Sequence, residues 1–195
     1  MMKRRQFALH VGLLVAAPGV LSACGDKTAV AAAPPAAKTS APDAYALAAQ
    51  GTGFTVGAPM AANTVYVFFD TTCPHCAHLW SESKPLLGRL KMVWMPVGLL
   101  RDSSAPQGAT ILAASDPAAA MAQNEALLME RKGGIPISAT LPPELVAKVK
   151  VNTELFLKTG AESVPLIVFR NAKSGEHGLH AGAVDTAQLA AMVGV

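Results

Sequence analysis

The sequence predicts an α/β domain in which a β-α-β unit is followed by a helical insertion and then by a β-β-α unit. A β-branched and aromatic run at residues 64–69 and an apolar run at 92–97 have the composition of buried strands. The interval between them is long enough for one helix, so the two strands should pair in parallel. A strand pair and a capped helix at the carboxyl end complete the predicted order.

The helix of the β-α-β unit should begin directly after the first strand. Cys73 occupies its N-cap position and Pro74 its first turn, where the missing N–H of proline costs nothing. Apolar and small residues then recur with helical spacing. Pro85 should kink this helix and Gly88 should end it.

The helical insertion should contain at least two bounded helices. One is expected to begin after an Asp116 N-cap and to end at residues 131–133, Arg-Lys-Gly. Another should begin at Pro143 and close at Gly160.

The carboxyl-terminal unit is predicted to be a hairpin followed by a helix. Its strands should lie at residues 166–169 and 178–181 and be joined by a turn at 171–175. Asp185 and Gln188 have the spacing of a capping box, in which each side chain accepts a hydrogen bond from the other residue's backbone N–H.

Residues 1–23 have the pattern of a secretory signal peptide, because three basic residues at 3–5 precede a mostly apolar stretch at 7–20. This stretch is shorter than the roughly 20 apolar residues that a membrane-spanning helix needs. Residues 21–24, Leu-Ser-Ala-Cys, resemble the bacterial lipobox, and the resemblance implies that Cys24 becomes the lipidated first residue of the mature protein. We therefore expect a protein of the periplasm that a lipid anchor holds at a bacterial membrane.

The segment after the lipobox should tether the folded domain to that membrane. Gly25 stands where lipoproteins of the inner membrane tend to carry Asp, which weakly favours the outer membrane. Residues 25–50 hold 11 alanines and 3 prolines, and Pro42 should break any helix there. We assign residues 24–43 to the tether and 44–195 to the folded domain.

Composition excludes several classes of protein. Because 51% of the residues are hydrophobic, the chain can build a core and is not a disordered protein. The basic residues at 3–5 account for the whole net charge of +3, so the mature chain should be neutral. The sequence has no basic run, which argues against nucleic acid as a partner.

Cys73 and Cys76 form a Cys-x-x-Cys motif at the junction of a strand and a helix, a pattern that indicates a redox-active pair. If Cys24 is lipidated, they are the two thiols left in a compartment where disulfides persist. Cys73 lies at the positive end of the helix dipole, which stabilises its thiolate, and a positively charged His75 would add to this effect. We predict that Cys73 attacks and Cys76 resolves the mixed disulfide, with no cofactor besides this redox-active pair.

Three other readings of the motif stay open. A purely structural disulfide would add little stability here, because the loop that it closes contains only two intervening residues. A zinc site needs four ligands, and only His75 and His78 lie near the cysteines in sequence, so we predict no metal. Copper delivery would use Met60, Met92 or Met95, but methionines at such positions are more often part of a core.

Taken together, these features resemble the thioredoxin superfamily, specifically the catalytic domain of the DsbC/DsbG periplasmic thiol-disulfide proteins. The likeness covers about residues 64–195, and its most specific parts are residues 65–70, Val-Tyr-Val-Phe-Phe-Asp, and 113–118, Ala-Ala-Ser-Asp-Pro-Ala. The resemblance implies a thioredoxin fold with a helical insertion. It also implies that Pro165 is cis and faces the cysteine pair, and that Val164 offers backbone hydrogen bonds to an extended peptide.

The resemblance further implies an enzyme, a thiol-disulfide oxidoreductase that exchanges disulfides or reduces sulfenic acids in exported cysteine-containing proteins. A DsbD-type membrane reductant would recharge it. Pro74 and His75 form the dipeptide of the DsbA oxidases, and Val164 is also DsbA-like, so the alternative is a disulfide donor reoxidised by a DsbB-type quinone system. Residues 24–63 are too short for the family's dimerisation domain and linker, so we expect a monomer. Position 67, where thioredoxin and DsbA carry a buried carboxylate, is valine, which leaves the proton acceptor of Cys76 unassigned.

Overall fold

A computed structural model describes residues 39–61 and 64–195 of the chain. The predicted signal peptide, the lipidation site at Cys24 and the tether up to residue 38 lie outside the described residues. Within the described ranges, no helix is both long enough and apolar enough to cross a membrane.

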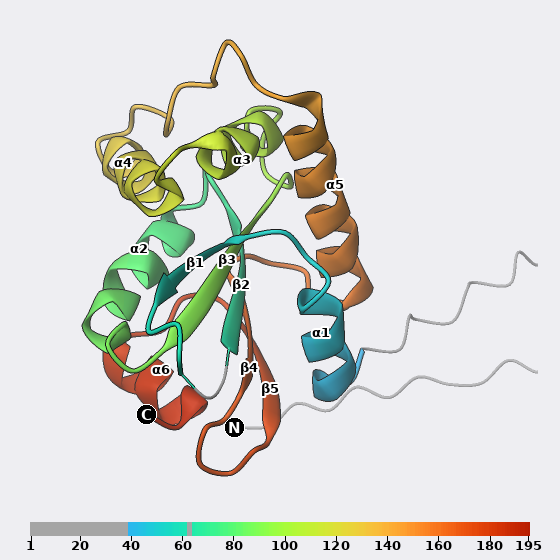
Figure 1. Cartoon of the computed structure of the whole chain (residues 1–195), viewed down its shortest axis with the longest axis vertical. Coiled ribbons are helices and arrows are strands. Elements are labelled where there is room, and N and C mark those ends of the chain that lie inside the picture. Colours follow the sequence, from blue (N-terminus) through green and yellow to red (C-terminus); the bar gives the residue numbers. More distant parts are fainter. Residues whose placement is uncertain (1–38, 62–63) are drawn as a thin grey trace, which may run out of the picture. The chain divides into compact units, whose positions relative to one another are not determined.

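The centre of the domain is a five-stranded sheet with the order β1-β3-β2-β4-β5 (Figure 1). Strands β2 and β3 are parallel, as predicted, and the other neighbours are antiparallel. The strands are β1 (Phe54–Gly57), β2 (Thr64–Asp70), β3 (Lys91–Val97), β4 (Leu166–Arg170) and β5 (His177–Ala181). The predicted strands at 64–69, 92–97, 166–169 and 178–181 are thus confirmed within one or two residues.

Helices cover both faces of this sheet, with α2 and α6 on one side and α1 and α5 on the other (Figure 1). Helices α3 and α4 pack against each other at one end, where α3 contacts α5 and α4 contacts α2. The helices are α1 (Ala41–Ala48), α2 (Pro74–Ser83), α3 (Ser104–Ala113), α4 (Pro117–Met129), α5 (Pro143–Lys158) and α6 (Thr186–Val193), with a 3₁₀ turn η1 (Lys84–Leu86) after α2. This arrangement is the predicted thioredoxin fold with its helical insertion.

Two predicted helix ends are wrong. Helix α2 ends at Ser83 and passes into the 3₁₀ turn η1, because the ring of Pro85 cannot continue an α-helix. The helix therefore stops well before Gly88. Helix α4 ends at Met129, and Arg131 already adopts a left-handed backbone with φ of 60°, ahead of the glycine that was expected to end the helix.

The segment before β1 corrects the predicted tether. Helix α1 lies within residues 25–50, and Pro42 does not break it, because a proline in the first turn has no intrahelical hydrogen bond to lose. The Ser40 side chain accepts a hydrogen bond from the backbone N–H of Asp43 and caps this helix. Ala44 and Ala48 are buried, and α1 contacts β4 and β5, so the folded domain begins before residue 44.

The predicted capping box of α6 is confirmed. The Asp185 carboxylate accepts a hydrogen bond from the backbone N–H of Gln188 at 2.7 Å, and the Gln188 side chain accepts one from the backbone N–H of Asp185 at 3.2 Å. Thr186, the next residue, donates from its hydroxyl to the backbone oxygen of Glu82 at 2.8 Å. This contact fixes α6 against the end of α2.

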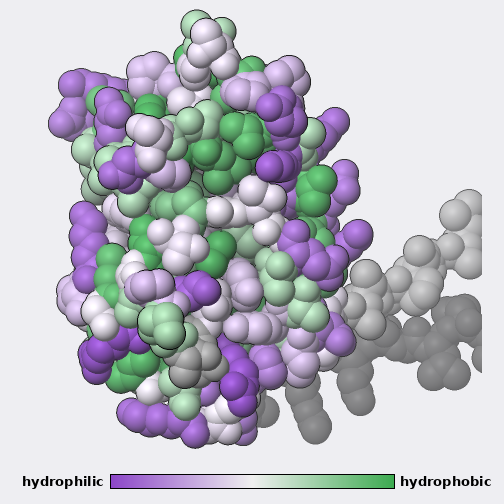
Figure 2. Space-filling view, viewed as in Figure 1, coloured by the Kyte–Doolittle hydropathy of each residue, from purple (hydrophilic) through white to green (hydrophobic). Residues whose placement is uncertain are grey.

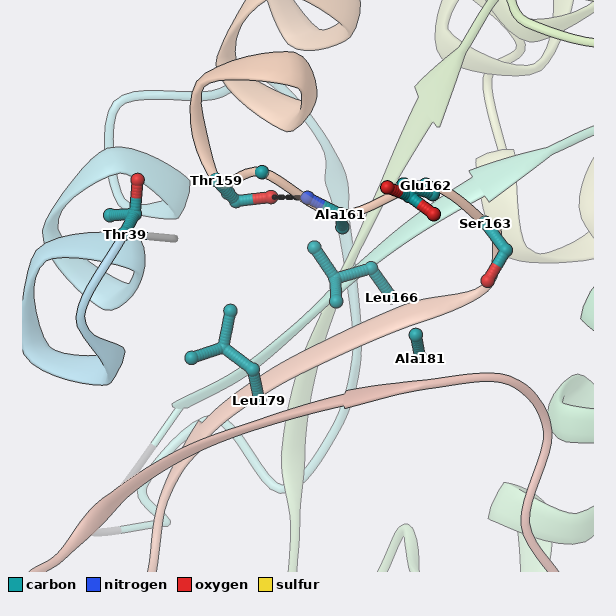
Figure 3. A pocket seen from close by; sticks show the side chains of 9 residues that line it. Thr39, Thr159, Ala161, Glu162, Ser163, Leu166, Leu179 and Ala181 are labelled. Carbon is teal, nitrogen blue, oxygen red and sulfur yellow. Dashed lines mark hydrogen bonds between the residues drawn. The ribbon is translucent and has the colours of Figure 1, made fainter. Parts of the chain in front are cut away.

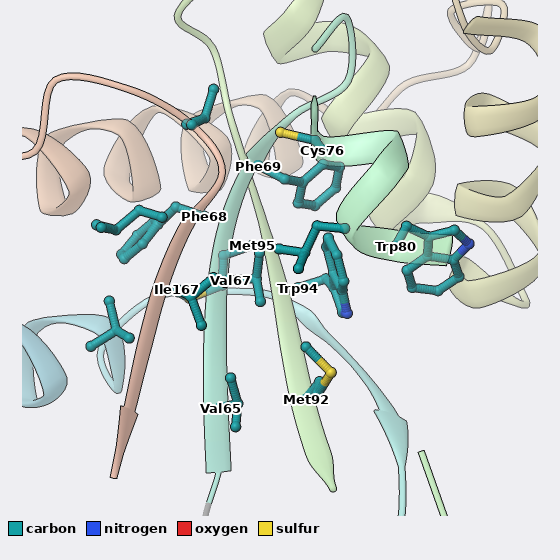
Figure 4. Close-up of a cluster of buried hydrophobic side chains, with 14 of the residues drawn as sticks. Val65, Val67, Phe68, Phe69, Cys76, Trp80, Met92, Trp94, Met95 and Ile167 are labelled. Atoms are coloured by element: carbon teal, nitrogen blue, oxygen red, sulfur yellow. The ribbon is translucent and has the colours of Figure 1, made fainter. Parts of the chain in front are cut away.

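Aromatic side chains fill the core between α2 and the sheet (Figure 4). Trp80 of α2 contacts Trp94 of β3 edge to face, with ring centroids 5.1 Å apart, and Phe69 contacts Trp94 in the same way at 5.7 Å. Cys76 lies at the edge of this cluster and is fully buried. On the outer surface shown in Figure 2, hydrophobic residues lie in small groups among hydrophilic ones.

Candidate active site

The two cysteines of the motif lie where β2 passes into α2. Cys73 is the N-cap of α2, as predicted, and Cys76 lies one turn into the helix. Both are free thiols and both are buried, with 3% and 0% of their surface exposed. Pro74 and His75, between them, are exposed. The motif therefore presents its loop to solvent and keeps its second thiol in the core.

The Val164–Pro165 peptide bond is cis and lies against the cysteine pair. In its protonated form, Cys73 donates a hydrogen bond to the backbone oxygen of Val164 at 3.6 Å, which joins positions 91 residues apart in the sequence. The structure thus brings together Cys73, Cys76, Val164 and Pro165, the residues that the sequence and the resemblance select.

Hydrogen bonding separates the acidities of the two thiols. The pKa of Cys73 is lowered to about 6, first because the Cys76 thiol donates to its thiolate. The backbone N–H groups of Cys76 and His75 and the charge of the His75 imidazole add to this lowering, while burial opposes it. Burial in the core raises the pKa of Cys76 well above its ordinary value, and its hydrogen bond to Cys73 raises it further. Near neutral pH, Cys73 is therefore a thiolate and Cys76 a thiol.

Asp70, the last residue of β2, holds the loop that carries Cys73. One carboxylate oxygen accepts hydrogen bonds from the backbone N–H of Thr72 at 2.9 Å, from its hydroxyl at 2.8 Å and from the Ser104 hydroxyl at 2.7 Å. The other accepts from the backbone N–H groups of Leu99 and Leu100 at 2.9 and 3.0 Å. Since both oxygens are engaged, Asp70 is a fixed structural acceptor that ties the loop to the start of α3.

The insertion also holds this loop through Asn124 of α4. The Asn124 amide donates to the backbone oxygen of Thr71 at 2.9 Å and accepts from the backbone N–H of Ile135 at the same distance. The Gln107 side chain of α3 accepts a hydrogen bond from the Thr71 hydroxyl at 3.1 Å. The motif therefore rests on contacts from helices that follow it by 30 to 50 residues.

Glu125 is a site residue that sequence reasoning missed. It is 5% exposed, and one carboxyl oxygen accepts a hydrogen bond from the Asn124 amide at 3.3 Å, while the other has no partner among the described residues. The pKa of Glu125 is raised to about 8, first by burial and then by the negative charge of Cys73, while the Asn124 hydrogen bond opposes the rise. Its own charge in turn raises the pKa of Cys76. A carboxyl group thus lies beside the pair even though position 67, the place expected from the resemblance, holds a buried valine.

A signal for Glu125 does exist in the sequence. The buried face of α4 consists of Ala120, Met121, Asn124 and Glu125, which follow one another at helical spacing. Two of these four side chains are polar. A polar pair on the apolar stripe of a helix indicates a buried site, because burying polar groups costs free energy unless they are hydrogen-bonded or paired.

A hollow of about 420 Å³ lies behind the loop that leads to the cis peptide (Figure 3). Leu166, Leu179 and Ala181 point into it from β4 and β5, and Glu162 is its one charged lining residue. Neither cysteine lines it. We therefore assign it no part in thiol chemistry.

The metal hypotheses find little support in the geometry. In the part of the chain that the structure describes, there is no cluster of three or more His, Cys, Asp or Glu side chains that would hold a metal ion. Met92 and Met95 are buried in the core, as predicted for structural methionines, whereas Met60 is almost wholly exposed.

Comparison with known proteins agrees with this geometry. The sequence model of the family described as thioredoxin matches residues 49–132. The thiol:disulfide interchange protein DsbG of Pseudomonas aeruginosa is 29% identical over 136 residues, which are 69% of this chain and 52% of that protein. DsbG of Escherichia coli is 30% identical over 112 residues, 56% of this chain and 44% of that protein. The chain spans about half the length of these curated relatives.

Among solved structures, the catalytic domain of Proteus mirabilis ScsC superposes with a TM-score of 0.60 at 22% identity. The match covers 78% of this chain and 93% of that domain. At 22% identity, the superposition establishes the fold alone. The sequence matches add a similarity to the DsbG proteins. The chain therefore has a thioredoxin-like fold and is similar in sequence to the DsbG thiol:disulfide interchange proteins.

Proposed function

We propose that the chain is a DsbG-like thiol-disulfide oxidoreductase of the periplasm, which exchanges disulfides or reduces sulfenic acids in exported proteins through Cys73 and Cys76. The observation that carries the proposal is the division of acidity within the motif, with a pKa of about 6 at Cys73 and a strongly raised pKa at Cys76. This division gives one attacking thiolate and one thiol held in reserve. The leader at residues 1–23 and the lipobox cysteine support export and anchoring, which remain proposals.

In the first step, the Cys73 thiolate attacks one sulfur of a partner disulfide. A bond forms between Cys73 and that sulfur, and the other partner sulfur leaves as a thiolate. With a sulfenic acid, the same attack expels the oxygen as water after it takes up a proton. The backbone of Val164, beside Cys73, is the proposed edge on which an extended partner segment lies.

In the second step, Cys76 displaces the partner from Cys73, and for this it must lose its proton. Forming the mixed disulfide removes the negative charge from Cys73, which had raised the pKa of both Cys76 and Glu125. We propose that Glu125 then releases its own proton to solvent more readily, and that the resulting carboxylate accepts the Cys76 proton. The Cys76 thiolate attacks the Cys73 sulfur, the intramolecular disulfide forms, and the partner leaves reduced by two electrons.

The direction of electron flow follows from the stability of the reduced form. A pKa of about 6 at Cys73 lies below the roughly 7 of thioredoxin and above the roughly 3.5 of DsbA. Because a stabilised thiolate favours the reduced protein, we expect a potential between about −270 and about −120 mV. The exposed Pro74 and His75 favour the second candidate, a DsbA-like disulfide donor recharged by a DsbB-type oxidant instead of a DsbD-type reductant.

Equilibration in glutathione buffers, followed by tryptophan fluorescence, tests the proposal. Trp80 lies four residues after Cys76 and contacts Trp94 in the core, so its emission should report the redox state of the pair. A potential near −270 mV would support the reductase and one near −120 mV the donor. The absence of any two-electron couple would refute both and return metal binding to consideration.

A further inference from the structure

A hollow of about 430 Å³ opens beside the loop of the motif, although Cys73 itself does not line it. Thr72 and Pro74, which flank Cys73, form one wall. Arg101 and Ser103, from the loop between β3 and α3, and Leu128 and Arg131, from the end of α4, line the rest. A group held in this hollow would therefore lie against the two chain neighbours of Cys73.

All charged residues that line this hollow are positive. Its two charged lining residues, Arg101 and Arg131, are exposed guanidinium groups on different elements. Neither has an ion-pair partner within residues 39–61 and 64–195. Glu130, next to Arg131, is instead engaged by Lys132 at 2.7 Å. The guanidinium groups thus remain available to an incoming anion, and arginine suits carboxylates through its fork of N–H donors.

The backbone that carries the two arginines is held in place. Arg131 adopts φ of 60°, a left-handed conformation that non-glycine residues rarely take, and its N–H donates to the Leu128 oxygen at 2.9 Å. The next turn is fixed by the Gln107 amide, which donates to the Gly133 oxygen at 2.8 Å. On the opposite side, the N–H of Arg101 donates to the Ser104 hydroxyl, which in turn donates to Asp70. The network that holds Cys73 therefore also holds Arg101.

We propose that this hollow binds an acidic side chain next to the reactive cysteine of a client protein, and so selects clients with Asp or Glu beside that cysteine. The inference rests on the proposed function, because the client sulfur is placed by attack of Cys73. It adds a substrate preference that the cysteine pair alone cannot provide. Val164 would hold backbone on one side of the client cysteine, and Arg101 with Arg131 would hold a carboxylate on the other.

Two peptides test this preference, Glu-Cys-Glu and Gln-Cys-Gln at the centre of otherwise identical sequences. Each cysteine is linked as a disulfide to 2-thiopyridine, whose low thiol pKa makes it the leaving group when Cys73 attacks the peptide sulfur. A Cys24→Ser background leaves Cys73 and Cys76 as the remaining thiols. The absorbance of released pyridine-2-thione gives a second-order rate constant for each peptide.

We expect the acidic peptide to react about fivefold faster than the neutral one at low salt, since exposed charge pairs are modest in strength and screened by salt. Arg101→Glu and Arg131→Glu should each bring the ratio of the two rate constants to one or below. Lys148→Glu is the matched control, because this exposed lysine of α5 lies outside the hollow, so the variant changes the net charge equally and should keep the ratio. Thermal unfolding checks that each variant is folded.

A ratio near one in the parent protein would overturn the proposal while leaving the proposed function intact. Equal loss of preference in Lys148→Glu and Arg131→Glu would also overturn it, because the net charge of the protein would then be enough to explain the preference. If oxidised glutathione alone showed the arginine dependence, the hollow would serve a small anionic disulfide instead of clients. If neither peptide reacted, the thiol-disulfide function itself would fall.

Discussion

The β-α-β frame and the helical insertion contribute differently to the candidate active site. The frame, from β2 through α2 to β3, places the two thiols with local sequence signals such as a strand end, an N-cap and a first-turn proline. The insertion, from α3 to α5, places no thiol, but it contributes Glu125, which interacts electrostatically with the pair, and Arg131, which lines the hollow beside the motif loop. In the proposed mechanism the frame therefore supplies the thiols for exchange, and the insertion supplies the proton acceptor and the client preference.

Removing the thiols should have the largest effect. Cys73→Ser should abolish exchange with a disulfide peptide, because no other described thiol has a lowered pKa. Cys76→Ser should still form mixed disulfides but should not release them, so covalent partner adducts accumulate and appear on a non-reducing gel. Unchanged turnover in Cys73→Ser would show that Cys73 is not the attacking thiol.

Glu125→Gln separates the insertion's chemical role from its structural one. We expect formation of the mixed disulfide to keep its rate and its resolution by Cys76 to slow by about 100-fold, a typical loss for a missing proton acceptor. Stopped-flow measurement of the two phases distinguishes them. Glu130→Gln, an exposed position on the same helix end, is the matched control. Equal resolution rates in parent and Glu125→Gln would contradict the proposed proton transfer.

The same carboxyl makes stability depend on pH. Its pKa in the folded chain is about 8, above the ordinary 4.5, so its contribution is fully present below pH 4.5 and is lost as pH rises through 8. The parent should lose a few kcal/mol over this range relative to Glu125→Gln, at about 1.4 kcal/mol per pKa unit. Urea unfolding of the reduced proteins at several pH values measures this difference. If the free energies of unfolding of parent and Glu125→Gln changed with pH in the same way, the prediction would be contradicted.

Asp70→Asn tests the support that the frame gives to the loop. Replacing one carboxylate oxygen by an NH₂ group sets donors either against the N–H groups of Leu99 and Leu100, or against the N–H and hydroxyl of Thr72 and the hydroxyl of Ser104. We expect a loss of roughly 2–4 kcal/mol in the free energy of unfolding. Asp116→Asn, at the N-cap of α4, should cost less than about 0.5 kcal/mol, because asparagine caps equally well.

The smallest effect should come from His75. The Cys76 hydrogen bond is the leading cause of the lowered Cys73 pKa and the His75 charge is the last, so Cys76→Ala should raise that pKa more than His75→Ala. Titration of Cys73 in both variants shows which substitution raises its pKa more. A larger rise in His75→Ala would show that the imidazole, and not the Cys76 thiol, is the main stabiliser of the Cys73 thiolate.

Sequence patterns predicted the frame well, because its signals are local. The strands, the Cys73 N-cap and the Asp185 capping box depend on residues a few positions apart, and the structure confirms them. Strand β1 and helix α1 escaped prediction, since β1 is a four-residue edge strand and Pro42, which was expected to break a helix, lies in the first turn of α1. Glu125 and Arg131 approach the cysteines only when α4 packs against α2, and no short-range pattern encodes that contact.

The most direct test of the account is the alkylation rate of Cys73 by iodoacetamide as a function of pH, measured in reduced Cys24→Ser protein with peptide mapping of each thiol. Because the thiolate is the species that reacts, the Cys73 rate should rise to half its plateau near pH 6, while Cys76 stays unmodified well above that pH. If Cys73 instead titrated near the roughly 8.5 of a free thiol, or if both cysteines reacted together, the division of acidity on which the mechanism depends would not exist.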